Sequence, residues 1–243
     1  MLTVGSLFSG IGGMDLGLER AGHKVIWQSE IDTYANRVLQ KHWPNVPNIG
    51  DVTKIDWKKT PYVDLIAGGY PCQPFSVAGQ RRGTNDARHL WPYFRNAISR
   101  IRPRYALLEN VPGHVTLGLP TVIGNLATLG YDAEWQIISA AAFGAPHLRE
   151  RLFIVAYPEG KQGNGRKNGN VFNESAKSWL QGAFGRMGGN ERLPQWQNEP
   201  NVGRVANGVS NRVDRLKGLG NAVVPQIAEF MGYLIGEHAK QFQ

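Results

Sequence analysis

The chain has 243 residues, 42% of them apolar, so it can bury a full hydrophobic core and does not have the composition of a disordered protein. No run of about 18 apolar residues occurs and the first residues lack a basic leader, so we expect a soluble cytoplasmic protein with no membrane association. The only cysteine, Cys72, excludes an intramolecular disulfide and a multi-cysteine zinc site, and we expect no metal.

The positive charge is concentrated in two stretches of the chain. The formal net charge is +8 and the pI is near 9.7. Residues 79–104 carry seven Arg against Asp86 alone, and residues 149–217 carry twelve basic against six acidic residues, whereas residues 1–78 are balanced at seven of each. Two basic stretches beside a neutral segment indicate a surface that binds phosphates, and a solvated basic face without a partner is the alternative.

Residues 1–157 alternate apolar, strand-like runs with amphipathic helical patterns. Strands are predicted at 2–8, 24–30, 63–70, 104–110, 134–140 and 151–157, and helices around 13–21, 33–42, 89–101 and 119–129. This alternation predicts an α/β fold with a mostly parallel sheet. The last two strands are separated only by a short turn region and could instead form an antiparallel edge.

The remainder of the chain has a different composition. Residues 160–208 contain ten Gly and eight Asn among 49 residues. We interpret residues 158–215 as a small, loop-rich recognition region, and a flexible insertion without function is the alternative. A last helix, from about Gln226 to Ala239, is predicted to pack back on the sheet, so that residues 1–157 and 216–243 form one domain.

A glycine-rich turn follows the first predicted strand, with the sequence Phe8-Ser9-Gly10-Ile11-Gly12. It directs backbone N–H groups and a helix N-terminus to a site where an adenosyl ligand could bind. Glu30 ends the next strand, and an acid there can accept hydrogen bonds from ribose hydroxyls. NAD enzymes share this pattern, and many such turns need glycine only for the bend.

Cys72 directly follows an apolar predicted strand, within the segment GGYPCQPFS of residues 68–76. A rigid Pro-X-X-Pro turn would hold its thiol at the rim of the sheet, where open α/β folds bind ligands. Packing is the alternative role, although a structural cysteine would more naturally lie inside the strand. Residues 76–86 then form a Gly- and Arg-bearing loop suited to closing over a substrate.

Two further acids follow predicted elements: Asp51 comes after the second predicted helix, at what could be a strand end, and Glu109 ends a predicted strand. Asp51, in Gly50-Asp51-Val52, could bond an adenine amino group, and a helix or turn cap is the alternative. Glu109, in Glu109-Asn110-Val111, follows a buried run. Beside a reactive thiol it suggests a proton donor with a raised pKa, provided that the two strand ends are neighbours in a parallel sheet; a structural acid is the alternative.

The chain resembles the DNA cytosine-C5 methyltransferase family of the bacterial or phage modification type. FSGIGG, Glu30, GDV, PCQPFS, ENV, HLRER and GLGNAVVP occur in the family's order, over residues 4–157 and about 216–230. The resemblance implies a Rossmann-like sheet that uses S-adenosyl-L-methionine, residues 1–157 plus 216–243 as the catalytic and cofactor-binding domain, and residues 158–215 as the target-recognition region. It implies a monomer acting on double-stranded DNA, and it leaves a cognate restriction endonuclease as an open question.

The resemblance also assigns roles to individual residues. Cys72 would add to C6 of a flipped-out cytosine, Glu109 would donate a proton to N3, and Arg149 and Arg151 would bind phosphate and orient the base. DNA contacts would come from Gln73, Ser76, Arg81 and Arg82. The cofactor site would be lined by Phe8, Ser9, Gly10, Ile11, Gly12, Glu30, Ile31, Asp51, Val52, Asn221 and Val223.

Three residues depart from the family's pattern. The family often has an acid in place of Ser6 and an Ala in place of Ser9, and usually a Gln in place of His147. Three other functions remain alternatives: an RNA (tRNA) cytosine-C5 methyltransferase of the same fold, a catalytically silent nucleic-acid-binding homologue, and a nucleotide-dependent oxidoreductase. The intact Cys72 and Glu109 motifs argue against the last two.

Overall fold

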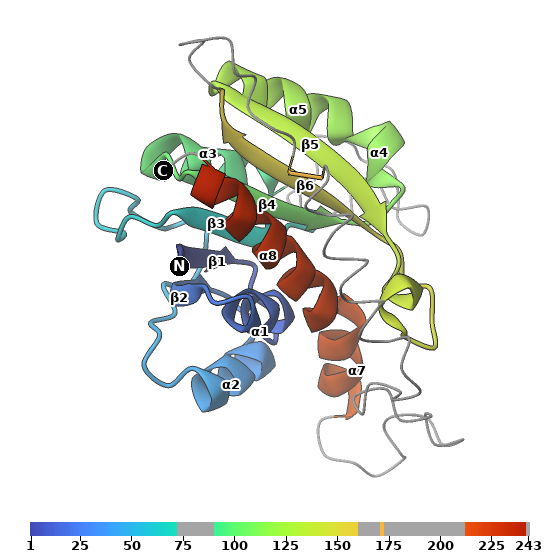
Figure 1. Ribbon diagram of the computed structural model, residues 1–243. Helices are drawn as coiled ribbons and strands as arrows, with labels where there is room; N and C mark the ends of the chain where they lie inside the picture. Colours follow the sequence, from blue (N-terminus) through green and yellow to red (C-terminus); the bar gives the residue numbers. More distant parts are fainter. Residues whose placement is uncertain (72–89, 160–170, 173–211, 242–243) are drawn as a thin grey trace.

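The computed structural model describes residues 1–71, 90–159, 171–172 and 212–241 (Figure 1). Within these ranges the chain forms a six-stranded sheet with the strand order β2-β1-β3-β4-β6-β5. The strands are β1 Thr3–Leu7, β2 Lys24–Ser29, β3 Leu65–Gly69, β4 Tyr105–Asn110, β5 Tyr131–Ile138 and β6 Arg151–Pro158. The helices are α1 Gly13–Arg20, α2 Thr33–His42, α3 Trp91–Ile101, α4 His114–Leu117, α5 Leu119–Thr128, α7 Arg212–Asn221 and α8 Pro225–Gln241, with a 3-10 turn, η3, at Ala140–Phe143.

The sheet is parallel on one side and antiparallel on the other. Strands β2, β1, β3 and β4 run parallel, whereas β6 pairs antiparallel with β4 and β5 pairs antiparallel with β6. The predicted α/β sheet and its antiparallel edge are therefore both confirmed. The carboxyl ends of β1, β3 and β4 meet at one edge, which is where ligands bind in open α/β sheets.

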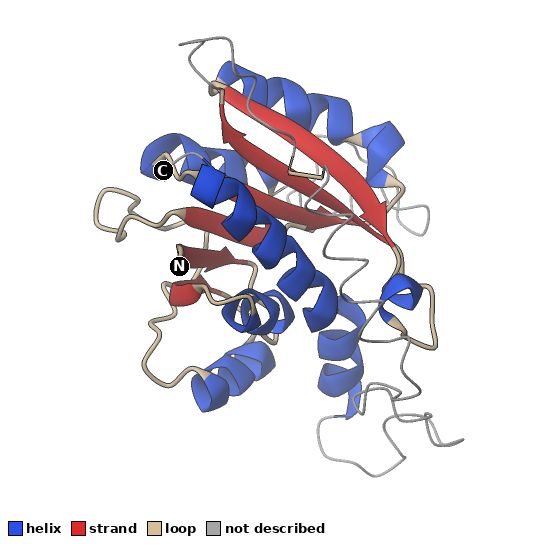
Figure 2. Cartoon of the chain, viewed as in Figure 1, coloured by secondary structure: helices blue, strands red, loops and turns tan. Residues whose placement is uncertain are grey.

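Helices cover both faces of this sheet (Figure 2). One core cluster joins α1 and α8 to the sheet through side chains such as Leu18, Leu107 and Ile235. The other joins α3 and α5 to the opposite face through side chains such as Phe94 and Leu126. Because the central strands are buried on both faces, their sequences are continuous apolar runs rather than alternating patterns.

Helix α8 packs back on the sheet, as the sequence predicted. Helix α7 differs from the prediction, because it begins at Arg212, inside the stretch interpreted as loop-rich, and the predicted boundary at 215/216 falls within it. Its sequence, RVDRLKGLGN, has too few apolar residues to show a helical period. None of the helices in the described ranges is long and apolar enough to cross a membrane.

Candidate active site

The turn after β1 has the backbone conformation that its glycines predict. Gly10 and Gly12 have positive φ angles of 55° and 83°, and Gly12 is the N-cap of α1. The Gly12 N–H donates to the Ser9 carbonyl oxygen at 2.9 Å, which closes the turn. Phe8 also has a positive φ, 53°, which is uncommon for a non-glycine residue and marks a strained backbone at the end of the strand.

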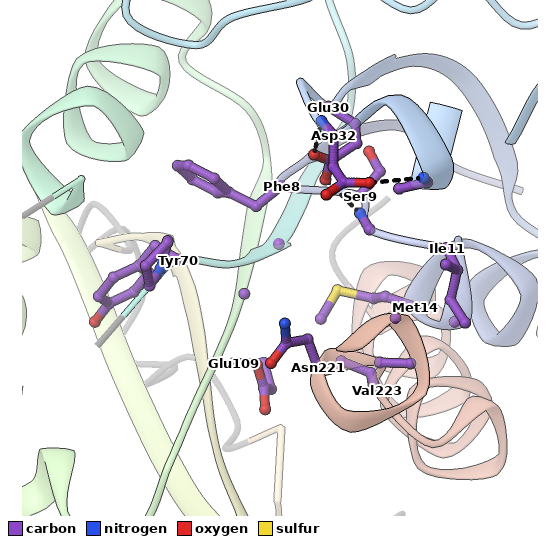
Figure 3. A pocket seen from close by; sticks show the side chains of 18 of the residues that line it. Phe8, Ser9, Ile11, Met14, Glu30, Asp32, Tyr70, Glu109, Asn221 and Val223 are labelled. Carbon is purple, nitrogen blue, oxygen red and sulfur yellow. Dashed lines mark hydrogen bonds between the residues drawn. The ribbon is translucent and has the colours of Figure 1, made fainter. Parts of the chain in front are cut away.

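Glu30 holds this turn through its carboxylate (Figure 3). Its Oε2 accepts the Gly10 N–H at 2.8 Å, while its Oε1 accepts the N–H groups of Ile31 at 2.8 Å and Asp32 at 2.7 Å. Asp32 in turn caps α2, since its Oδ1 accepts the N–H groups of Tyr34 and Ala35. Asp32 was not among the predicted site residues, although an Asp just before a helical pattern is a recognisable N-cap signal.

A fully buried carboxylate lies in the first turn of α1. Asp15 accepts the Ser6 hydroxyl at 2.5 Å and the Gln28 side-chain amide at 2.6 Å, which joins α1 to β1 and β2. Burial raises the pKa of Asp15 to about 6, against the opposing effect of these two donors. Ser9 donates to the Ser6 carbonyl oxygen at 3.2 Å, so both serines that depart from the family's pattern support the glycine turn.

A cavity of about 730 Å³ opens at the carboxyl edge of the sheet (Figure 3). Helix α7 and the residues that follow it, up to Val223, line it from the far end of the chain. The predicted site residues that line it are Phe8, Ser9, Gly10, Ile11, Glu30, Ile31, Glu109, Arg151, Asn221 and Val223. Lining side chains that the sequence analysis did not name include Met14, Asp32, Tyr34, Tyr70 and Asp214.

Four other predicted residues are not among the described residues that line the cavity. Gly12 shapes the turn, and Val52 is buried in the core beneath the sheet. Asp51 takes the capping role that was its alternative: its Oδ1 accepts the backbone N–H and the hydroxyl of Thr53. The strand expected before Asp51 is reduced to an isolated bridge between Gln28 and Asn48. Arg149, the fourth, donates hydrogen bonds to the end of α7.

Glu109 lies at the strand end next to the segment that leads to Cys72. The parallel register of β3 and β4 pairs Gly69 with Glu109, so the neighbouring strand ends that the sequence analysis required are present. The Arg151 Nε lies 2.9 Å from Glu109 Oε1, and both side chains are largely buried. Burial raises the pKa of Glu109 to about 7, although the charges of Arg151 and Arg149 act to lower it.

Tyr70 is fixed at the carboxyl end of β3 by two contacts. Its hydroxyl lies 2.7 Å from His114 Nε2, and its carbonyl oxygen accepts the Asn110 side-chain amide at 3.2 Å. Neither Tyr70 nor His114 was among the predicted site residues. The predicted residues Cys72, Gln73, Ser76, Arg81 and Arg82 lie outside the described residues. In the described part of the chain no cluster of three or more His, Cys, Asp or Glu side chains could hold a metal ion.

Comparison with known proteins places these features in one family. The family model described as C-5 cytosine-specific DNA methylase matches residues 2–200. Type II methyltransferase M.DsaV of Dactylococcopsis salina is 38% identical over 158 residues, covering 63% of this chain and 45% of that protein. Type II methyltransferase M.Eco47II of Escherichia coli is 43% identical over 165 residues, covering 63% and 39%.

Solved structures share the architecture. One is described as a DNA modification methyltransferase encoded within an Escherichia coli prophage; it is 27% identical, with a TM-score of 0.56 over 71% of this chain and 55% of that one. The Entamoeba histolytica methyltransferase EhMeth shares the fold, with a TM-score of 0.64 over 98% of both chains at 16% identity. This chain spans less than half the length of the two curated relatives. Because the family model covers most of its residues, the chain belongs to the C-5 cytosine-specific DNA methylase family.

Proposed function

We propose that this chain is a DNA (cytosine-5-)-methyltransferase that acts on a cytosine flipped out of duplex DNA. The observation that carries the proposal is Glu109, a buried acid paired with Arg151 at the end of β4, next to the strand that leads to Cys72. Its pKa, raised to about 7, suits an acid that must hold a proton near neutral pH and then donate it. Residues 158–215 would select the DNA target.

The cavity fits S-adenosylmethionine, the cofactor of this family, which supplies a methyl group activated on a sulfonium. Its volume of about 730 Å³ is that of a small-molecule site. Phe8, Ile31 and Val223 give it apolar walls suited to an adenine ring. The Glu30 carboxylate accepts three backbone N–H groups, and a carboxylate has about four acceptor positions, so capacity remains for a ribose hydroxyl.

The charge around the cavity favours a cationic ligand over an anionic one. Three acids, Glu30, Asp32 and Asp214, belong to its described lining, while the one basic side chain there, Arg151, is paired with the proton donor Glu109. The phosphates of a dinucleotide would be repelled by this set, whereas a sulfonium or ammonium group would be attracted. The charge therefore argues against the nucleotide-dependent oxidoreductase that the glycine turn alone left open.

In the proposed reaction the side chains act on the cytosine ring in turn. The Cys72 thiolate adds to C6 while Glu109 donates its proton to N3, so the ring becomes an enamine that is nucleophilic at C5. After C5 takes the methyl group, a base removes the C5 proton, the bond between C6 and sulfur breaks to release the Cys72 thiolate, and N3 returns its proton to Glu109, which restores the neutral aromatic ring. Arg151 would hold Glu109 in position and favour the thiolate form of a nearby cysteine.

Covalent trapping tests this proposal directly. A duplex with 5-fluorocytosine at the target position cannot lose a C5 proton, so with cofactor present it should form an adduct that survives denaturing electrophoresis. Cys72→Ser should form no adduct, although it leaves the glycine turn and Glu30 intact and should still bind S-adenosylmethionine in calorimetry. Adduct formation by the Cys72→Ser protein, or an adduct mapped to another residue, would overturn the proposed mechanism.

A methyl-transfer assay separates DNA from RNA as the substrate. Labelled cofactor is incubated with the protein and either duplex DNA or transfer RNA, and the Cys72→Ser protein is the matched control. We expect the wild-type protein to label DNA and not transfer RNA. The Cys72→Ser protein should label neither. Label on transfer RNA alone would support the RNA alternative and contradict the assignment to DNA.

A further inference from the structure

The junction between α7 and α8 completes the cavity from far along the chain. Ala222, Asn221 and Val223 line the cavity, and Figure 3 shows Asn221 and Val223 among its side chains. This junction lies beyond residue 200, where the match to the family model ends. A wall made from so distant a segment must be held in place by contacts with the rest of the molecule.

On one side the junction is held by Arg149, which precedes β6. Its Nη2 donates to the carbonyl oxygens of Ala222 at 2.6 Å and Gly220 at 2.7 Å, with a longer contact to Leu219 at 3.4 Å. The last carbonyl groups of a helix lack partners within the helix and carry partial negative charge. A guanidinium is suited to them, because it is planar, always charged and has several donors in a fixed geometry.

Arg149 reaches this position with an unusual backbone. Its φ is +32°, in the left-handed region that non-glycine residues rarely adopt. Arg151, two residues further along, is paired instead with Glu109, and its Nε lies 2.9 Å from Glu109 Oε1. The two arginines of the HLRER motif therefore serve different partners, one the end of α7 and the other the buried acid.

On the other side the junction rests against the start of α1. A Cβ added at Gly13 would lie 2.4 Å from the Val223 carbonyl oxygen. The first residue of α1 is therefore so close to this backbone that only glycine fits. The junction thus lies between two fixed points, the Arg149 guanidinium and the backbone at Gly13. Both contacts involve its main chain.

We propose that Arg149 is a positioning residue that holds residues 219–223 as the end wall of the cofactor cavity. This role differs from the contact to phosphate or base that the sequence resemblance implies for Arg149. It rests on the proposed function, because the ligand behind the wall is S-adenosylmethionine. If the wall is in place in only a fraction of molecules, the apparent cofactor affinity is the full affinity multiplied by that fraction.

The test compares Arg149→Gln and Arg149→Lys with the wild type in the full chain. Without ligand, we expect both variants to exchange the amide hydrogens of residues 219–224 faster, the Gln variant most. We expect Arg149→Gln to raise the Kd and KM for S-adenosylmethionine roughly tenfold. At saturating cofactor most of the lost activity should return, because the defect lies in cofactor binding. The lysine variant should restore part of the affinity, because one ammonium group can still bond one or two of the carbonyl oxygens.

Arg102 provides a matched control. It too has a left-handed backbone, with φ +56°, and its guanidinium donates to a backbone carbonyl, that of Leu129 just after α5. It is not among the residues that line the cavity. Arg102→Gln should therefore change thermal stability in the same direction as Arg149→Gln, while the Kd for S-adenosylmethionine stays at the wild-type value.

Two outcomes would overturn the proposal. One is unchanged exchange at residues 219–224 in Arg149→Gln; the other is an unchanged cofactor Kd with a raised KM for DNA, which would make Arg149 a DNA contact. A wild-type protein that binds no S-adenosylmethionine would contradict the proposed function instead, and the exchange comparison would still decide whether Arg149 holds the junction.

Discussion

Two glutamates at the same edge of the sheet have opposite surroundings. Glu30, after β2, accepts three backbone N–H groups that the turn and the start of the α2 segment supply. Glu109, in β4, is largely buried and faces one arginine, and burial outweighs that charge so that its pKa rises to about 7. Backbone donors stabilise a carboxylate as an acceptor, whereas burial favours its protonated form.

The contrast teaches how one fold gives the same side chain two functions. Glu30 is built into the backbone and suits a permanent acceptor, because its donors cannot move without unfolding the turn. Glu109 sits where a proton can be held or released near neutral pH. Substitution of Glu109 or of Glu30 removes one side of this comparison.

The largest effect is expected from Glu109→Gln. An amide has nearly the same shape but cannot give N3 a proton, so adduct formation on 5-fluorocytosine DNA should slow by about 10²–10⁴-fold. Rates are measured by rapid quench at saturating cofactor. A rate within threefold of wild type would show that Glu109 is not the proton donor.

The pH dependence sharpens the same experiment. Glu109 must be protonated to act as the proton donor. Its contribution to the wild-type rate of adduct formation should therefore disappear as the pH rises through about 7. In Glu109→Gln that loss should be absent, and only the rise from Cys72 ionisation should remain. A falling limb that persists unchanged in the glutamine variant would assign it to another group.

A smaller effect, on cofactor binding, is expected from Glu30→Ala. This substitution removes the carboxylate that accepts three backbone N–H groups. The binding free energy of S-adenosylmethionine should weaken by about 1.5–3 kcal/mol. Calorimetry measures it, and DNA affinity should stay close to wild type. Glu134→Ala is a matched control, because Glu134 also accepts two backbone N–H groups and one hydroxyl but is not among the cavity's lining residues. Equal loss in both variants would indicate general destabilisation.

The smallest effect concerns Asp15 behind the glycine turn. Its pKa is raised from 3.8 to about 6, so the folded state takes up a proton at a higher pH than the unfolded state. Lowering the pH from 7.5 to 5 should therefore stabilise the wild type relative to Asp15→Asn by about 1 kcal/mol. Urea unfolding of both proteins at both pH values measures this difference. Parallel changes in the two proteins would mean that Asp15 does not titrate in this range.

The sequence predicted most of what the backbone pattern determines. The order of strands and helices and the turn before α1 follow from apolar runs and glycines. The pairing of β3 with β4, on which the expected role of Glu109 depended, comes from the structure. Helix α7 was missed because its residues have no clear apolar period. Asp15 and the contacts that Arg149 makes with α7 were not predicted for another reason: the partners, Gln28 and the end of α7, are distant in sequence, and local patterns do not show such contacts.

The antiparallel direction of β6 affects how this strand is aligned with β4. Arg151 is its first residue, and in a parallel strand it would begin at the opposite edge, on the order of 15 Å from Glu109. Both faces of β6 are apolar, with Leu152 and Ile154 on one side and Phe153 and Val155 on the other. A slip by one residue would exchange one apolar set for another, so hydrophobicity alone distinguishes the two alignments poorly. The contact between Arg151 and Glu109 exists in only one of them, and we expect this ion pair to fix the alignment of the strand as well as serve the site.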